Sequence, residues 1–321
     1  MCADDGTCVA GIGGTTEIRV GSVPVHSCAG WFCARAFLRA GWFCARAFLR
    51  GKNVLSMEGA ASYHFSPVGV VHSCYRTKFG IPRQSGLIEQ AEGTIELLPP
   101  YNQPNIIRGL ETFSHIWIIF LFHQNLRDGW KATVRPPRLG GDRRLGVFAT
   151  RSSFRPVPIG LSAVKLEGIE QRPHGKLLLK VRGLDLVDGT PVLDIKPYLP
   201  YADAITGATG GFAPEAPESV LKVTVAPEAA AVLERRGSRF RELCLRVVAG
   251  DPRPAYQRIP GREYQCYLED CEVVWEAGER PDEAHILRVN EHVTPSPLPS
   301  DDFSSFVFKV SSSSSTPNIK E

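Results

Sequence analysis

The sequence lacks the patterns that mark several classes of protein. Its nine cysteines are scattered and odd in number, and no CxxC pair occurs among them. This distribution indicates neither a disulfide framework nor a zinc site, and it fits a reducing cytosol. No GxGxxG motif follows a predicted strand, so the chain offers no Rossmann-type nucleotide site.

Long apolar runs are also missing. The most apolar segment, IWIIFLF at residues 116–122, is far shorter than the roughly 20 residues that span a bilayer, and it is typical of a buried strand. The first residues after Met1 include acidic ones, and no basic region precedes an apolar one, which argues against a secretory signal. We therefore expect a cytoplasmic protein without a membrane partner.

The chain as a whole has little excess of positive over negative charge, but one segment has a large excess. The net charge of the 321 residues is +3, which says little about partners. Between Arg127 and Arg155, eight basic residues stand against only Asp128 and Asp142, a local charge of +6. A basic segment of this kind suits a phosphate or RNA, and a solvated face without a partner is the alternative.

The segment at residues 145–160, LGVFATRSSFRPVPIG, is the centre of the prediction. Residues 147–150 indicate a buried strand, and the prolines that follow indicate that the chain then leaves the sheet as a shaped loop. Arg151 and Arg155 on such a loop would bind an anion or a carboxylate. A solvated surface loop is the alternative interpretation.

The order of the predicted elements indicates a mainly β fold, with a small β-barrel domain at residues 65–205. Its expected strands are residues 66–72, 93–98, 113–122, 161–169, 176–181 and 192–195. A segment rich in alanine, glycine, proline and threonine, residues 202–217, is the expected linker to a second domain.

The second domain, at residues 218–293, is expected to be smaller and of the α+β class. Its expected elements are a strand at residues 221–225, helices at 228–236 and 240–249, and strands at 264–275 and 285–289. Pro227 stands where a helix can start, and Gly250 stands where one stops.

The two ends of the chain differ from the rest. Within residues 1–60, the motif AGWFCARAFLR occurs twice in tandem, at residues 29–39 and 40–50. Two copies are fewer than the three or so that repeats need to bury a face, so we expect a disordered extension. An amphipathic interfacial helix is the alternative. The tail at residues 294–321 contains a serine run and is also expected to be disordered.

Several motifs, in the right order, resemble those of the TrmO family, also called YaeB or TsaA-like. They are PRQ at residues 82–84, FSHIW at 113–117, FHQ at 122–124, RPPRLGG at 135–141, GVFATRSSFRP at 146–156 and LDLVDGTPVLDIKPYLP at 184–200. DPRPAY at residues 251–256 is similar to the C-terminal motif of bacterial members. The likeness excludes the N-terminal repeat and the serine tail.

This resemblance implies an S-adenosylmethionine-dependent tRNA methyltransferase. The family methylates the exocyclic nitrogen of threonylcarbamoyladenosine next to the anticodon, so the implied partner is a tRNA anticodon loop. The resemblance also implies a small β-barrel in place of a Rossmann-like sheet, and a homodimer. A non-catalytic RNA-binding or regulatory protein of the same fold is one alternative, and methylation of another substrate is a second.

The resemblance also implies a cofactor site. The matching residues are Pro82, Arg83, Gln84, His123, Gln124, Arg151, Asp185, Leu186, Val187 and Asp188. One position departs from the family, because Val157 stands where an asparagine is usual between two prolines. A polar group that could orient cofactor or substrate is therefore missing.

A base would help the reaction, because a carbamoyl group withdraws the lone pair of the attacking nitrogen. The candidates are Asp185, Asp188 and His123, in falling order, although an aspartate before a glycine is also a common turn pair. Contacts with RNA are expected from the basic segment and from the C-terminal loop. These candidates are Arg135, Arg138, Arg143, Arg144, Arg253 and Tyr256.

Overall fold

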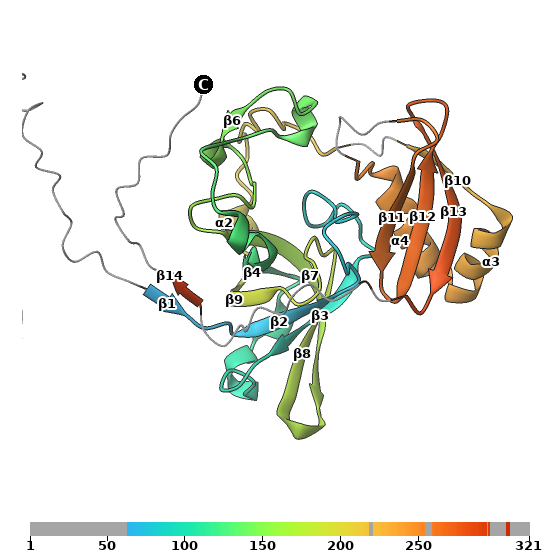
Figure 1. The fold of residues 1–321 in the computed structure, drawn as a ribbon. Helices are drawn as coiled ribbons and strands as arrows, with labels where there is room; N and C mark the ends of the chain where they lie inside the picture. Colours follow the sequence, from blue (N-terminus) through green and yellow to red (C-terminus); the bar gives the residue numbers. More distant parts are fainter. Residues whose placement is uncertain (1–62, 218–220, 254–258, 294, 296–305, 309–321) are drawn as a thin grey trace, which may run out of the picture. The chain divides into compact units, whose positions relative to one another are not determined.

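The first domain is a closed barrel of six antiparallel strands (Figure 1). In their order around the barrel, the strands are β2 (Gly69–Ser73), β3 (Glu92–Leu97), β8 (Lys176–Arg182), β7 (Ile159–Arg172), β4 (His115–Leu121) and β9 (Pro191–Pro197). The computed structural model describes residues 63–217, 221–253, 259–293, 295 and 306–308. The mainly β fold with a barrel is thus confirmed.

Alternation of side chains along the strands builds the barrel core. On β4, Ile116, Ile118 and Phe120 are buried, and on the neighbouring strand β7 the buried positions include Val164 and Leu166. Successive side chains of a strand point to opposite faces, so one face of each strand fills the interior. Each fully buried aliphatic side chain contributes about 1.5–3 kcal/mol.

Short elements surround the barrel. They are the 3-10 helices η1 (Pro104–Ile107), η2 (Leu110–Thr112), η3 (His123–Asp128), η4 (Pro137–Leu139), η5 (Val147–Ala149) and η6 (Pro173–Gly175), the paired strands β5 (Thr133–Val134) and β6 (Leu145–Gly146), and the helix α2 (Pro200–Asp203). β1 (Tyr63–Phe65) pairs with β14 (Phe306–Phe308), which lies within the segment expected to be disordered.

The prediction of a strand at residues 147–150 is wrong. Residues 147–149 form η5, and the side chain of Phe148 is 78% exposed. The Thr150 hydroxyl donates to the Val147 carbonyl oxygen at 2.9 Å, which closes the turn. β6 ends at Gly146, immediately before η5, so the β5–β6 ladder does not extend through this apolar run.

The second domain is a four-stranded sheet with two helices (Figure 1). The strand order is β10 (Lys222–Val225), β13 (Glu283–Glu291), β12 (Cys271–Ala277) and β11 (Glu263–Leu268), and β10 runs parallel to β13. The helices are α3 (Pro227–Arg236) and α4 (Ser238–Ala249), close to their predicted bounds. The single strand expected at residues 264–275 is instead the hairpin β11–β12, which turns at Glu269, where φ is +55°.

Some predictions cannot be compared with the structure. The tandem repeat and most of the serine-rich tail lie outside the described residues. Within the part of the chain that is described, no helix is long and apolar enough to cross a bilayer.

Candidate active site

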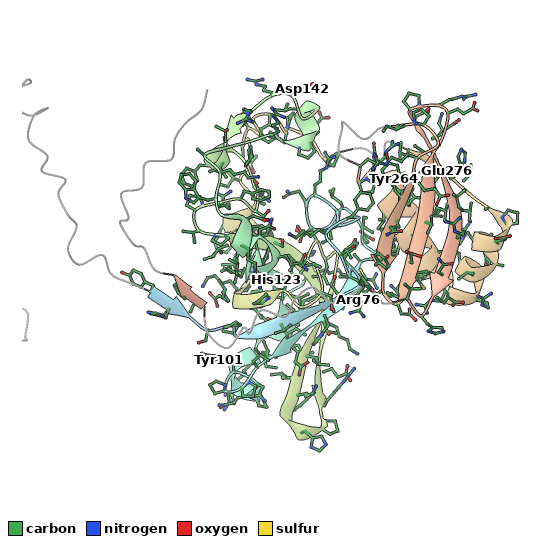
Figure 2. All side chains as sticks on the ribbon, viewed as in Figure 1. Arg76, Tyr101, His123, Asp142, Tyr264 and Glu276 are labelled. Carbon is green, nitrogen blue, oxygen red and sulfur yellow. The ribbon has the colours of Figure 1, made fainter. Side chains whose placement is uncertain are left out.

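A cavity of about 490 Å³ lies at one end of the barrel. It is lined by the loop at residues 81–84, the end of β4 with the start of η3, the loop after η5, the start of β7 and the turn that precedes β9. This volume falls in the range of 300–1,000 Å³ that is typical of small-molecule sites. The predicted cofactor residues that line it are Pro82, Arg83, Gln84, His123, Gln124, Arg151, Asp185, Leu186 and Val187. Figure 2 labels His123, the first residue of η3.

Asp185 has the most distinctive carboxyl group in the cavity. Its Oδ1 atom is covered and has no hydrogen-bond partner among the described residues. Desolvation by burial raises the pKa of Asp185 to about 6, although the Ser162 hydroxyl, the Ser85 backbone amide and the charge of Arg151 each lower it. A carboxyl group with this pKa exchanges protons near neutral pH, which suits a general base.

Asp188 is placed differently from the other predicted cofactor residues. It does not line the cavity. Its Oδ1 accepts a hydrogen bond from the Ser73 backbone amide at 2.8 Å, and its Oδ2 accepts one from Arg76. Because both oxygens accept hydrogen bonds from the protein, Asp188 holds the turn in place, and Asp185 is the better candidate for the base.

Cationic groups also line the cavity. Lys78, which the sequence analysis missed, donates from Nζ to the Gln124 carbonyl oxygen at 2.9 Å, and desolvation lowers its pKa. Arg151 donates to the side-chain oxygen of Gln84. Lys78, Arg83 and Arg151 therefore surround the cavity with positive charge, which favours a carboxylate or phosphate group.

Arg155 also lines the cavity, where its own loop holds it. Its guanidinium donates to the Thr150 carbonyl oxygen at 2.7 Å, so it is held by the backbone of its own loop. It stabilises the turn around η5, and this turn presents Arg151 to the cavity. Both arginines expected to bind an anion line the cavity, and Arg151 donates to the Gln84 side chain where Arg155 donates to its own backbone.

Two apolar features shape the cavity wall. The rings of Phe120 and Phe122 meet edge to face, with centroids 5.0 Å apart. A Cβ atom at Gly160 would lie 2.2 Å from Cζ of Phe120, so only glycine leaves room for this ring. Phe120, Phe122, Gly160 and Ser162 line the cavity as well and were not predicted as site residues.

A second cavity, of about 1,190 Å³, adjoins the first. The two cavities share Arg83, Gln84, Thr150, Arg151 and Ser153 in their linings. The remainder of the second lining includes Lys131, Arg135, Arg138, Arg144, Phe148 and parts of residues 210–217, with Glu215 as the acidic member. We call this second cavity the basic groove.

The structure separates the predicted RNA contacts. Arg135, Arg138 and Arg144 line the basic groove, whereas Arg143 is not part of its lining. Arg253 differs from them, because it is 3% exposed and its Nε donates to Asp251 Oδ1 at 2.6 Å, which suits a structural role better than a phosphate contact. Tyr256 lies outside the described residues.

Both domains match one protein family. The tRNA-methyltransferase O N-terminal domain matches residues 70–204, and the TrmO C-terminal domain matches residues 218–292. The chain belongs to the TrmO family. The two matched stretches cover most of the described residues, and the first contains every residue that lines the candidate cofactor cavity.

Relatives in the TrmO family support this placement. A tRNA (adenine(37)-N6)-methyltransferase of Escherichia coli K12 is 47% identical over 220 residues, which cover 67% of this chain and 93% of that protein. One of the same name from Rattus norvegicus is 44% identical over 43% of this chain and 31% of its own length. The crystal structure of TrmO from Pseudomonas aeruginosa superposes with a TM-score of 0.60 at 42% identity, covering 72% of this chain and all of that one.

The cavity residues fit the cofactor that the family implies. Oε1 of Gln124 is covered and has no hydrogen-bond partner among the described residues, so a donor on a bound ligand would satisfy it. The cations around the cavity suit the carboxylate of a methionine group. In the described part of the chain, no group of three or more metal-binding side chains is present.

Proposed function

We propose that this chain is a tRNA methyltransferase that transfers a methyl group from S-adenosylmethionine to the exocyclic nitrogen of threonylcarbamoyladenosine next to the anticodon. The observation that carries the proposal is Asp185, a desolvated carboxyl group in a small-molecule cavity that opens into a basic groove. Relatives named tRNA (adenine(37)-N6)-methyltransferase, at up to 51% identity, support the reaction. A Pseudomonas aeruginosa relative, 49% identical, has a name that describes an S-adenosylmethionine-dependent methyltransferase.

The smaller cavity would hold the cofactor. Arg83 and Arg151 are the proposed partners of its carboxylate, and Gln84 and Gln124 offer hydrogen bonds to its polar groups. When bound, S-adenosylmethionine supplies an electrophilic methyl group with a thioether as its leaving group. The aromatic wall of Phe120 and Phe122 excludes water from the space beside them.

Asp185 is the proposed base. As the nitrogen forms its bond to the methyl carbon and the bond from that carbon to sulfur breaks, the nitrogen's proton passes to the Asp185 carboxylate. The hydroxyl of Ser162 and the amide of Ser85 face the same carboxyl group and orient it. Alignment of the nucleophile with the methyl group contributes up to roughly 7–11 kcal/mol to such reactions.

The basic groove would hold the RNA. Arg135, Arg138 and Arg144 offer contacts to phosphates, and Phe148, 78% exposed, offers a surface on which a base can stack. The hydrogen bond between Arg151 and Gln84 lies at the boundary of the two cavities. A modified base that leaves the groove at this boundary would enter the smaller cavity.

The departure at Val157 does not favour a non-catalytic protein. Val157 is 54% exposed and is not part of either cavity lining. The side chains that surround the cofactor space therefore remain complete without an asparagine at this position. This observation supports the enzyme over the non-catalytic alternative.

A homodimer is also part of the proposal, with a second copy on an apolar outer face of the barrel. Leu161, 50% exposed, lies opposite Ile119 across β7 and β4. Nε1 of Trp117 donates to Asp203 at 2.9 Å, which ties α2 to this face, and Tyr201 of α2 is 87% exposed. Exposed apolar groups gathered in this way are typical of interaction surfaces.

The cytoplasm, where tRNA is modified in a reducing medium, is the proposed location. Cys74, Cys244, Cys266 and Cys271 are free thiols, which agrees with that medium. We propose domain bounds of 65–205 for the cofactor-binding barrel and 218–293 for the C-terminal domain.

The test is methyl transfer from labelled S-adenosylmethionine to tRNA with and without the threonylcarbamoyl group. We expect label only in the threonylcarbamoylated tRNA. Equal label in both would refute the proposed substrate, and bound cofactor without transfer to either would favour the non-catalytic alternative.

The basic groove has its own test. Arg138→Ala should weaken tRNA binding and lower the salt dependence of log K by about one unit of slope, because one phosphate contact is lost. Arg172→Ala is the matched control, since Arg172 is exposed, pairs with Glu170 and is not part of either cavity lining. Equal slopes for the two variants, measured by titration at several salt concentrations, would contradict an RNA role for the groove.

A further inference from the structure

A short segment of the barrel domain, residues 73–76, lies between the cofactor cavity and the C-terminal domain. Tyr75 pairs with Val187 in a parallel bridge and with Leu268 in an antiparallel bridge. Val187 lines the cavity, and Leu268 is the last residue of β11. One fully buried residue therefore connects the cavity turn to the C-terminal hairpin.

Backbone hydrogen bonds reinforce both sides of this segment. The Asp188 amide donates to the Tyr75 carbonyl oxygen at 2.8 Å, on the cavity side. On the other side, the Glu269 amide donates to the Cys74 carbonyl oxygen at 2.7 Å, and the Arg76 amide donates to the Tyr267 carbonyl oxygen at 3.1 Å. The three segments thus run side by side as one small patch of sheet.

The side chain of Arg76 also connects the cavity turn, at Asp188, to the C-terminal hairpin, at Glu269. Its Nη1 donates to Asp188 Oδ2, and its Nε donates to the Glu269 carbonyl oxygen at 2.9 Å. The planar guanidinium can serve both acceptors at once, which a single ammonium group does less well. Figure 2 labels Arg76, just after the end of β2.

The C-terminal end of this connection is itself held firmly. The Glu269 carboxylate accepts hydrogen bonds from Arg236 at 3.0 Å and from Arg239. These arginines belong to α3 and α4, so the tip of the hairpin is tied to both helices of its domain. Arg76 therefore donates to a residue whose position is held by both helices, and its second hydrogen bond can restrain Asp188 in turn.

The turn that Asp188 closes forms part of the cavity wall through Asp185, Leu186 and Val187. We propose that Arg76 is a positioning residue, through which the C-terminal domain fixes the turn that binds the cofactor and presents Asp185. This inference rests on the proposed function and adds to it. The C-terminal domain then supports the cofactor site in addition to any contact that it makes with RNA.

The experiment measures the dissociation constant and KM for S-adenosylmethionine in the full-length Arg76→Ala variant. We expect both to rise about tenfold, while KM for tRNA stays within twofold of the wild-type value. Asp188→Asn should have a similar effect, and the double variant should be no worse than either single one, because the pair acts as a unit. Arg76→Lys should recover part of the loss.

Arg288→Ala is the matched control, because Arg288 pairs with Glu263 at 3.0 Å inside the C-terminal domain and is similarly exposed. Its cofactor binding should equal that of the wild type. Hydrogen exchange gives a readout that does not depend on activity. The amides of Asp188 and Gly189 should exchange at least tenfold faster in Arg76→Ala than in Arg288→Ala.

The outcomes separate the two proposals. Wild-type protein that binds no S-adenosylmethionine and transfers no methyl group would refute the proposed function, and this inference with it. Wild-type transfer, together with unchanged cofactor binding and unchanged exchange in Arg76→Ala, would refute the positioning role alone. An equal rise of KM for tRNA and for cofactor would also refute it, because a general loss of structure would then explain the effect.

Discussion

The C-terminal domain and the barrel each contain an aspartate that is shielded from water, but the surroundings of the two carboxyl groups differ. In the C-terminal domain, Asp251 and Arg253 are both 3% exposed and form an ion pair at 2.6 Å. Arg253 also lies over the rings of Tyr264 and Trp275. In the barrel, Asp185 has a covered oxygen without a hydrogen-bond partner among the described residues, and its pKa is raised to about 6.

The difference shows that the surroundings of a buried carboxyl group decide whether it stabilises the fold or exchanges a proton. A buried carboxylate that is paired with an arginine keeps its charge and fixes a loop. A desolvated carboxylate without such a pair takes up and releases a proton near neutral pH. The comparison predicts that neutralising Asp185 harms activity, whereas breaking the Asp251–Arg253 pair harms folding.

The largest expected effect is on catalysis. Asp185→Asn should lower kcat by about 10²–10⁴-fold, the range that a general base contributes, because its amide cannot accept the proton. The dissociation constant for S-adenosylmethionine, measured by calorimetry, should stay within about threefold, given the near-equal shape of the two side chains. Asp194→Asn, an exposed change on β9, is the control. A kcat within tenfold of the wild-type value would exclude Asp185 as the base.

The next effect is on stability. Arg253→Met should lower the free energy of unfolding by about 3–5 kcal/mol, because it removes the guanidinium that pairs with the buried carboxylate of Asp251. Arg288→Met removes an exposed pair in the same domain and should cost less than about 1 kcal/mol. Denaturant titration of both variants measures the difference. Equal losses would contradict the structural role of the buried pair.

The smallest effect concerns pH. The kcat of the wild type should rise with pH through about 6 and then level off, as Asp185 loses its proton, and Asp185→Asn should lack this rise. The free energy of unfolding should change in the opposite direction. Because folding raises this pKa above its ordinary value of 3.8, the protonated form is favoured, and its stabilisation is lost as pH rises through about 6.

Asp185→Asn should therefore be more stable than the wild type above pH 6, by at most about 3 kcal/mol, and the advantage should vanish near pH 4. Denaturant titrations of both proteins at pH 4, 6 and 8 check this. A variant that is less stable than the wild type at pH 8 would show that the charged carboxylate stabilises the fold.

The barrel was predictable from the sequence because its strands alternate in hydrophobicity, as β4 and β7 do. Prediction failed where the hydrophobic pattern of a short segment indicated one element and the folded chain formed another. The pattern at Val147 and Phe148 is typical of a strand, but these residues form η5, immediately after β6 ends. The turn at Glu269 was missed because Glu269 has a positive φ, and glycine is the residue that usually marks such a position in a sequence.

The site was predictable in part. Motifs far apart in the sequence do converge on one cavity, as Arg83, His123 and Asp185 illustrate. The sequence could not choose between Asp185 and Asp188, because that choice depends on which carboxyl group faces the cavity. Lys78 was missed because it lies outside the motifs, and Arg253 was assigned to the surface because an arginine is rarely buried.

The order of strands around the barrel has a consequence for folding kinetics. The barrel closes where β2 meets β9, strands at opposite ends of the domain's sequence, which pair at Gly69 with Val192 and at Val70 with Pro191. Contacts so distant in sequence form late, since the entropy of closing the intervening loop must be lost first. The turn at residues 185–190 leads directly into β9. We therefore expect the cofactor cavity to be completed late in folding, so that a ligand that binds there should slow unfolding more than it speeds folding.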